Sequence, residues 1–301
     1  MSAEQNSHAS TRPNDFALII GAMKSGTTSL FEVLRQHPQI CGANVKEPDY
    51  FLKDQSDPES YLNLWRWQGE RHKIAMEASV AYAKMPYFQG VPERIKNSNL
   101  GRFKFVYVLR DPLKRIESQV RHGIFAGWSR SLDEGIPDDA LQYSRYATQL
   151  DAYLEHFDRN DFFLVTLEEF KQRPNAVLAQ ICEFLNVDAD FQFSDAETVR
   201  NSGEFFSAPK SVAQVTQGTL GQFIAKHLLP AGLKNWLRRL LTKIGQRSVS
   251  TDDKERWRLS PAERSQVLDF LADDLKRLET EFGVDIGSRW SLNQSLQGEA
   301  E

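Results

Sequence analysis

The chain has 301 residues, which allows one large α/β domain or two modest ones. Hydrophobic residues make up 41% and charged residues 26%, the balance of a globular protein with enough apolar mass for a full core. The net charge of −4 argues against a general nucleic-acid-binding protein, and the spacing of Cys41 and Cys182 does not suggest zinc. Both cysteines are expected to be small buried hydrophobes in a reducing compartment.

The N-terminal residues 1–15 are polar, and the apolar stretch that starts at Phe16 is too short and interrupted for a secretory signal. No run approaches the ~20 apolar residues that a membrane-spanning helix needs. We therefore expect a soluble, cytoplasmic protein with a disordered segment 1–14 and a loose end at 291–301.

Short apolar runs alternate with longer helical patterns along the chain, which is typical of a mostly parallel sheet. The expected strands are 16–20, 73–77, 103–109 and 162–165. The expected helices are 28–37, 58–67, 112–125, 144–157, 174–185 and 261–282. The pattern predicts an α/β fold within one domain, residues 15–290. In this fold a P-loop-like central parallel sheet is flanked by helices, and a helical C-terminal cap covers its edge.

A loop bracketed by two glycines follows the first expected strand. Gly21 and Gly26 keep the spacing of the phosphate loop G-x-x-x-x-G-K-[ST], but Thr27 stands where that loop has its lysine, and the lysine is Lys24. Backbone N–H groups in such a turn, with the positive end of a helix behind them, form an anion site. Further hydroxyl donors come from Ser25, Thr27, Thr28 and Ser29. Lys24 would reach a bridging atom or a leaving group beyond the phosphate.

A second candidate anion site lies in "FVYVLRDPLKRIESQV", residues 105–120. Arg110 stands at the carboxyl end of an apolar strand, where open α/β sheets bind their ligands. Ser118 follows nearly two turns into the next expected helix. Together they offer a charged fork and a hydroxyl to a second anion, one βα unit away from the first loop.

The two segments together resemble the sulfotransferases, of bacterial and carbohydrate type, that use 3′-phosphoadenosine 5′-phosphosulfate (PAPS). The resemblance rests on K-S-G-T-T-x-L and on L-R-D-P-x-x-R-x-x-S about 80 residues later, and it covers roughly residues 15–290. It implies that Arg110 and Ser118 bind the ribose 3′-phosphate and that Lys24 steadies the oxygen left behind as the sulfuryl group departs. The residues implied to cradle the 5′-phosphosulfate are Lys24, Ser25, Gly26, Thr27, Thr28 and Ser29.

Sulfuryl transfer to an alcohol needs a base that removes the hydroxyl proton. The predicted base is Glu47 in "KEPDYF", because many members of the resembled family have a similar K-E-P-x-x-F segment whose glutamate is the base. Pro48 is expected to bias Glu47 to an extended backbone and so to fix where its carboxylate points.

Other residues are weaker candidates for the base. Glu77 in "MEASVAY" is one alternative, whereas His37 at the end of the first helix is expected to be structural. Carbohydrate enzymes of the resembled family often read E-K-[ST]-P-x-Y at this second segment. Here Ala78 replaces the lysine, and Lys46 is a candidate replacement charge.

A basic segment, 205–251, contains seven Lys or Arg and no Asp or Glu. The resemblance implies that this segment closes over the nucleotide, with Phe206 and Lys210 as candidate contacts. Its amphipathic stretch 223–247 has two interpretations. It either packs as helices on the core, or presents a basic face to the inner membrane surface, near a lipid-linked acceptor.

The sequence as a whole predicts a sulfotransferase that moves a sulfuryl group from PAPS to an acceptor hydroxyl. The acceptor is a carbohydrate, a glycolipid or a small metabolite, and the reaction involves neither a metal nor a nucleic acid. Two alternatives stay open, a P-loop nucleotide kinase and a non-catalytic nucleotide-binding module, and so does the oligomeric state. The kinase hypothesis conflicts with Thr27, which stands where the phosphate loop of kinases has its lysine, and with the lack of a clear magnesium-binding aspartate.

Overall fold

The computed structural model describes residues 11–54, 57–126, 135–194, 257–290 and 292. The chain forms two units. The first, which contains the sheet, consists of Met1–Val120, Gly135–Arg200 and Leu259–Glu301. The second consists of Arg121–Glu134 and Asn201–Arg258, and only 121–126 and 257–258 of it are described. The segment 205–251 therefore lies outside the described residues.

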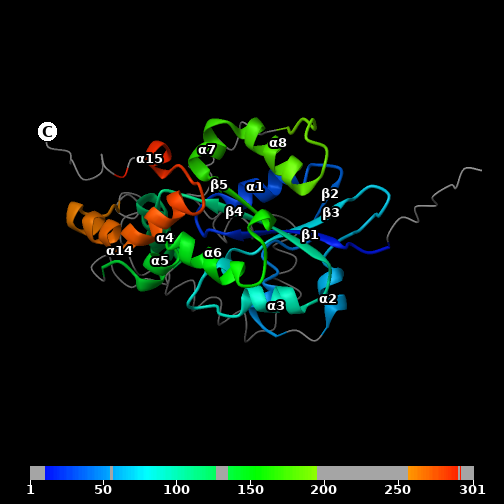
Figure 1. Cartoon of the computed structure of the whole chain (residues 1–301), viewed down its shortest axis with the longest axis horizontal. Coiled ribbons are helices and arrows are strands. Elements are labelled where there is room, and N and C mark those ends of the chain that lie inside the picture. Colours follow the sequence, from blue (N-terminus) through cyan, green and yellow to red (C-terminus); the bar gives the residue numbers. More distant parts are fainter. Residues whose placement is uncertain (1–10, 55–56, 127–134, 195–256, 291, 293–301) are drawn as a thin grey trace, which may run out of the picture. The chain divides into compact units, whose positions relative to one another are not determined.

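Five strands form one sheet in the order β2-β3-β1-β4-β5, and every neighbouring pair is parallel (Figure 1). The strands are β1 (Asp15–Gly21), β2 (Ile40–Gly42), β3 (Ile74–Ala78), β4 (Arg102–Leu109) and β5 (Phe162–Thr166). The predicted parallel α/β sheet is confirmed, and the one strand that the sequence pattern missed, β2, has only three residues. Because the strands are parallel, all five carboxyl ends meet at one edge of the sheet.

The described helices differ in length, and several are single turns or little more. They are α1 (Thr27–Leu34), α2 (Pro58–Leu62), α3 (Val91–Asn97), α4 (Pro112–Ala126), α5 (Asp138–Gln142), α6 (Tyr146–Leu154), α7 (Leu167–Gln172), α8 (Pro174–Leu185), α14 (Pro261–Thr280) and α15 (Ile286–Arg289). Three 3₁₀ turns add η1 (Tyr50–Leu52), η2 (Val80–Ala83) and η3 (Arg159–Asp161). The expected helix 58–67 ends at Leu62. In the described part of the chain, no helix has the length and apolarity to cross a membrane.

Alternate residues of the strands face two different layers of helices. On one face, Ile19, Met76 and Val106 pack with apolar residues of α1, α7 and α8. On the other face, aromatic rings dominate: Phe16 packs against Tyr61 of α2, at 5.8 Å between ring centroids. Figure 1 shows α1, α7 and α8 on one side of the sheet and α2, α3 and α6 on the other. The near-continuous burial of β1 and β4 follows from this double cover.

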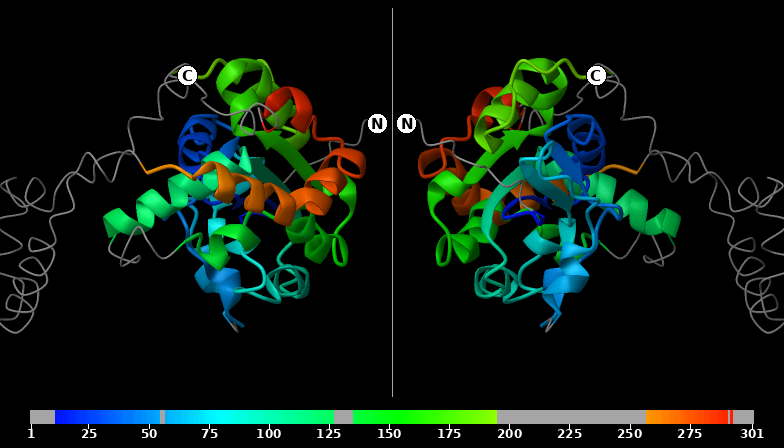
Figure 2. Two further views of the ribbon diagram at one scale, coloured as in Figure 1. Left: turned by 90° about the vertical axis from the view of Figure 1, so that its left-hand side faces the viewer. Right: turned by 90° about the vertical axis from the view of Figure 1, so that its right-hand side faces the viewer.

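The long helix α14, coloured orange in Figure 2, is joined to α6 by charged side chains. It begins with a capping box between Ser260 and Glu263. One turn before its end, Arg277 donates to both carboxylate oxygens of Asp151 at 2.7 and 2.8 Å. The buried Asp274 carboxylate accepts from the backbone N–H groups of Ala147 and Thr148 at 3.0 and 2.9 Å. It therefore satisfies N–H groups at the start of α6 that have no partner within that helix.

Removal of this capping carboxylate is expected to destabilise the protein. Asp274→Ala leaves one buried and one part-buried N–H group without an acceptor, and should lower the free energy of unfolding by about 2–3 kcal/mol in urea denaturation. Asp273→Ala, on the exposed side of the same helix, serves as the matched control and should change it by less than about 0.5 kcal/mol. Equal effects of the two substitutions would contradict this role of Asp274.

Candidate functional site

The loop between β1 and α1 has the geometry of an anion-binding turn. Ala22 N–H donates to the Val108 carbonyl at 2.7 Å, which ties the loop to the end of β4. Gly26 lies at φ +82° as the N-terminal cap of α1, so the first turn of that helix begins directly at the loop. That turn carries Thr27, Thr28 and Ser29. Its backbone N–H groups have no intrahelical partners, and together with the helix dipole they favour an anion.

One hydroxyl in this loop has no hydrogen-bond partner in the described structure. Ser25 is fully buried, and its Oγ makes no hydrogen bond there. A buried hydroxyl without a partner is costly, so such a group in a native fold needs an explanation. An oxygen of a ligand held by the loop would supply the missing partner.

Arg110 directly contacts the loop. It follows β4, and its Nη1 donates to the carbonyl of Lys24 at 2.7 Å. Its own carbonyl accepts from the Tyr146 hydroxyl at 2.7 Å. Burial lowers the pKa of this guanidinium, and the nearby Glu168 carboxylate opposes that effect. The structure thus brings the two predicted anion-binding segments together, with a half-buried cation between them.

For the other residues predicted to bind the donor, the structure gives less information about position. Ser118 lies partly exposed on α4, and the described structure gives its hydroxyl no hydrogen bond that would fix its orientation. Phe206 and Lys210 lie outside the described residues. The described residues hold no group of three His, Cys, Asp or Glu side chains that could bind a metal ion.

Glu47 lies at the same sheet edge as the loop. Its N–H donates to the Ala78 carbonyl at 2.9 Å, and Ala78 ends β3 in register with Ile19 of β1. Its carboxylate is paired with Lys46 and is 40% exposed, so solvent and ligands can reach it. The expectation of an extended backbone is wrong, because Glu47 lies at φ +59°. The hydrogen bond to β3 holds it in this conformation, although a following proline disfavours helical backbone angles.

Two charged residues near Glu47 were missed by the sequence analysis. Asp49, at φ +52°, has a pKa that burial and then the Glu47 carboxylate raise. Lys84 follows η2, and its ammonium lies 5.4 Å from the ring centroid of Tyr143. Burial lowers the pKa of Lys84, and the carboxylates of Glu47 and Asp49 oppose this. Asp49 could have been found within "KEPDYF", whereas no local pattern marks Lys84.

The alternative base, Glu77, is inaccessible to a substrate. It is fully buried on β3, and its carboxylate accepts from Ser79 Oγ at 2.7 Å. Desolvation raises the pKa of Glu77 to about 7, although its hydrogen bonds with Ser79 and Tyr82 lower it in part. The next residue, Ala78, is buried in the core on the opposite face of the sheet.

His37 is structural, as the sequence predicted. This buried side chain ends the turn after α1, where Nδ1 accepts from the Gln39 N–H at 3.0 Å. Its Nε2 lies 2.9 Å from the Asp188 carbonyl, and burial lowers its pKa. Cys41 and Cys182 are both free and buried, which agrees with their predicted place in the core.

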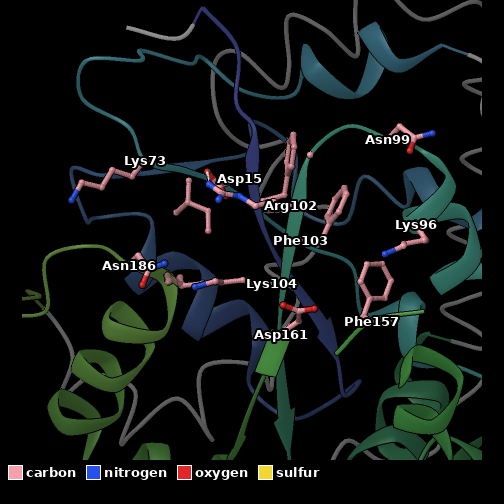
Figure 3. Close-up of a pocket in the computed structure, with 14 residues that line it drawn as sticks. Asp15, Lys73, Lys96, Asn99, Arg102, Phe103, Lys104, Phe157, Asp161 and Asn186 are labelled. Atoms are coloured by element: carbon pink, nitrogen blue, oxygen red, sulfur yellow. Dashed lines mark hydrogen bonds and ion pairs between the residues drawn. The ribbon is translucent and has the colours of Figure 1, made fainter. Parts of the chain in front are cut away.

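A cavity of about 750 Å³ lies at the opposite edge of the sheet (Figure 3). It is lined by the first residues of β1 and β4, Asp15 and Arg102, so it opens at the amino ends of the strands. Arg102 donates to both oxygens of Asp15 at 2.7 and 2.8 Å, and Lys104 donates to the Phe184 carbonyl. This cavity is separate from the loop and Glu47, which lie at the carboxyl ends.

These features define a class of protein: a parallel α/β fold in which a loop with the geometry of an anion-binding turn follows the first strand and meets an arginine after the fourth. A sequence profile of the sulfotransferase domain matches residues 14–216, more than half of the chain. The chain therefore belongs to the sulfotransferase family, and the predicted resemblance is confirmed.

The similar proteins include enzymes named for heparan sulfate. Heparan sulfate glucosamine 3-O-sulfotransferase 3A1 of Mus musculus is 27% identical over 201 residues, which cover 60% of this chain and 49% of the mouse protein. Bifunctional heparan sulfate N-deacetylase/N-sulfotransferase 1 of Caenorhabditis briggsae is 26% identical over 194 residues, which cover 56% of this chain and 22% of that protein. The chain thus spans about half the length, or less, of these curated relatives.

A solved structure shows the same fold. The sulfotransferase from Alicyclobacillus acidocaldarius superposes with a TM-score of 0.62 over 93% of this chain and 99% of that one, at 22% sequence identity.

A side chain at position 26 is expected to destabilise the loop. A Cβ at this position would lie 2.7 Å from Leu167 Cδ1, and its φ of +82° disfavours any side chain. Gly26→Ala should therefore lower the free energy of unfolding by more than the ~1–2 kcal/mol of left-handed backbone strain alone. Gly283→Ala is the matched control, because Gly283 lies at φ +69° with nothing within 4 Å of its Cβ position. Equal losses in urea denaturation would argue against the contact with Leu167.

The buried Glu77 should make stability depend on pH. Its pKa in the folded protein is about 7, against an ordinary value of 4.5, so between these values the folded protein retains a proton that the unfolded chain has lost. Relative to Glu77→Gln, the free energy of unfolding should therefore fall as the pH rises from about 4.5 to about 7, by up to about 1.4 kcal/mol per pH unit. A pH-independent difference in urea denaturation would contradict this.

Proposed function

We propose that this protein is a sulfotransferase that moves a sulfuryl group from PAPS to a hydroxyl of an acceptor. The observation that carries the proposal is the hydrogen bond from Arg110 to the carbonyl of Lys24. It joins the loop suited to one anion to a cation suited to a second anion, and PAPS carries two such groups on one adenosine. Membership of the sulfotransferase family supports the same donor.

We assign the donor to the loop and to the residues beside it. The 5′-phosphosulfate binds at residues 24–29, where the unpartnered Ser25 hydroxyl and the N–H groups at the start of α1 supply hydrogen bonds. Arg110 and Ser118 bind the 3′-phosphate. Phe206 and Lys210 remain predicted contacts in the part of the chain outside the described residues.

The proposed chemistry is an in-line displacement at sulfur. Glu47 takes the proton of the acceptor hydroxyl while the new S–O bond forms and the bond from sulfur to the phosphate oxygen breaks. Lys24 and the loop N–H groups stabilise the negative charge that develops on that phosphate oxygen. The exposed Glu47 carboxylate and its position beside the end of β3, the neighbour of β1, support this division of roles.

The acceptor binds on the Glu47 side of the loop. The relatives named for heparan sulfate favour a carbohydrate acceptor over the glycolipid and small-metabolite alternatives. Ala78 replaces a lysine that carbohydrate enzymes of the family often have, and Lys46 and Lys84 are the cations placed near Glu47. Contact of residues 223–247 with a membrane stays a prediction, because this stretch lies outside the described residues.

Lys24→Ala should lower kcat/KM about 10²- to 10³-fold, which corresponds to roughly 2–4 kcal/mol for one preorganised donor at a developing charge. The measurement is transfer of ³⁵S from labelled PAPS to a panel of hydroxyl compounds that includes heparan oligosaccharides, simple sugars and phenols. Lys276→Ala, exposed on α14, is the matched control and should leave transfer unchanged. Magnesium-dependent ATP turnover without any sulfuryl transfer would favour a kinase instead.

Glu47→Gln should reduce turnover strongly while leaving the affinity for adenosine 3′,5′-bisphosphate unchanged, because it removes the base but no donor contact. Calorimetry gives the affinity, and the ³⁵S assay gives kcat. Glu70→Gln makes the same chemical change at an exposed position and serves as the control. Near-normal turnover in Glu47→Gln would eliminate Glu47 as the base.

A further inference from the structure

The segment that carries Glu47 is held by two hydroxyl groups from another part of the chain. Asp49 N–H donates to Ser79 Oγ at 3.2 Å, and Phe51 N–H donates to the Tyr82 hydroxyl at 3.2 Å. Both acceptors belong to the segment that leaves β3, some 30 residues further along the chain. The turn that follows Glu47 is therefore fixed by side chains of the next strand and its exit.

Both hydroxyls converge on one buried carboxylate. Ser79 Oγ donates to Glu77 Oε2 at 2.7 Å. The Tyr82 hydroxyl interacts with the same carboxylate, and this interaction helps to lower the pKa of Glu77. An ionised carboxylate can only accept hydrogen bonds, so each of the two hydroxyl groups points its proton toward the carboxylate. The oxygen lone pairs of Ser79 and Tyr82 then remain available to the N–H groups of Asp49 and Phe51.

Glu77 has no role in the proposed binding of the donor or in the proposed proton transfer. It is fully buried, so it cannot take a proton from an acceptor, and its burial without a cation is costly. A hydrophobic residue would fill the same position on the aromatic face of β3 at lower cost, because Tyr61 and Tyr153 surround it there. The presence of a carboxylate at position 77 is explained if it orients the hydroxyl groups of Ser79 and Tyr82.

We propose that Glu77 is the positioning residue for Glu47: its carboxylate orients Ser79 and Tyr82, and these hold the turn 49–51 that fixes the Glu47 segment against β3. The inference rests on the proposed role of Glu47 as the base. It assigns a use to three residues of "MEASVAY" that face the Glu47 segment although the lysine of the family pattern is absent.

The anchor requires the ionised form of Glu77, which makes it sensitive to pH near neutrality. Burial is the main cause that raises the pKa of Glu77 to about 7, and the Asp49 carboxylate raises it further. The titratable groups that face it are Asp49 beside η1, Tyr61 of α2, Tyr82 of η2 and Tyr153 of α6. None of these is a cation, so nothing among them neutralises the charge that forms above pH 7.

Amide hydrogen exchange, followed by NMR, tests the anchor without any acceptor. At pH 8, Glu77→Gln should lower the protection of both the Asp49 and the Phe51 amides about tenfold, the difference between charge-assisted and neutral hydrogen bonds. Ser79→Ala should affect only the Asp49 amide, and Tyr82→Phe only the Phe51 amide. Glu70→Gln, exposed in the loop before β3, is the matched control.

Two results would overturn the proposal. One is unchanged protection of both amides in Glu77→Gln. The other is a loss equal to that of amides in the centre of β1, such as Leu18, which would indicate general destabilisation only. In the wild type, protection of the two amides relative to Leu18 should also fall as the pH is lowered from 8 to 6, and this dependence should vanish in Glu77→Gln.

The catalytic consequence is measured separately. With an acceptor that the wild type sulfates in the ³⁵S assay, Glu77→Gln should lower kcat at least tenfold at pH 8 and leave the affinity for adenosine 3′,5′-bisphosphate unchanged. Normal kcat despite lost amide protection would refute positioning of the base. Absence of transfer by the wild type to every acceptor would refute the proposed function, while the exchange experiment would still decide whether Glu77 anchors the turn.

Discussion

The hydrogen bond from Arg110 to the carbonyl of Lys24 joins two loops that are 86 residues apart in sequence. It is only one bond, but the parallel sheet makes it possible, because β1 and β4 are neighbours and their carboxyl ends lie at one edge. The same constraint brings Glu47, after β2, and Ser79, after β3, to that edge. The gathering of Lys24, Arg110 and Glu47 at one edge therefore follows from strand order more than from any single segment.

The same edge of the sheet also contains backbone conformations and buried polar groups that are unfavourable for the free energy of folding. Three of the five non-glycine residues described with positive φ are Lys24, Glu47 and Asp49. The unpartnered hydroxyl of Ser25 and the buried carboxylate of Glu77 lie within the same group of loops. Such conformations and burials oppose folding and persist only where the surrounding structure imposes them. The core on the α1, α7 and α8 face, made of close-packed aliphatic and aromatic side chains, supplies the compensating stability.

Long periodic segments were predictable because their signals are local. The strand pattern of 103–109 and the helix 174–185 fall within one residue of β4 and α8, and the latter is bounded by Pro174 and by Asn186 in the left-handed region. Shorter elements such as β2, α3, α5 and α7 were missed, since three to seven residues carry too little periodicity. They exist because neighbours in the fold complete their hydrogen bonds and bury their apolar side chains.

By itself the sequence determined the fold class and the family, and it marked the glycine-bracketed loop and Arg110 as neighbours in the fold, because glycine spacing and strand–loop–helix order are properties of contiguous residues. It also predicted that "KEPDYF" carries the carboxylate base, which stays a prediction. Only the tertiary structure decided that Glu47 has a left-handed backbone, that Asp49 and Lys84 lie beside it, and that Glu77 is buried beneath the turn. These features depend on which loops the sheet brings together. The burial and the electrostatic environment of a side chain are set by all residues around it in the fold, and many of those residues are far apart in the sequence.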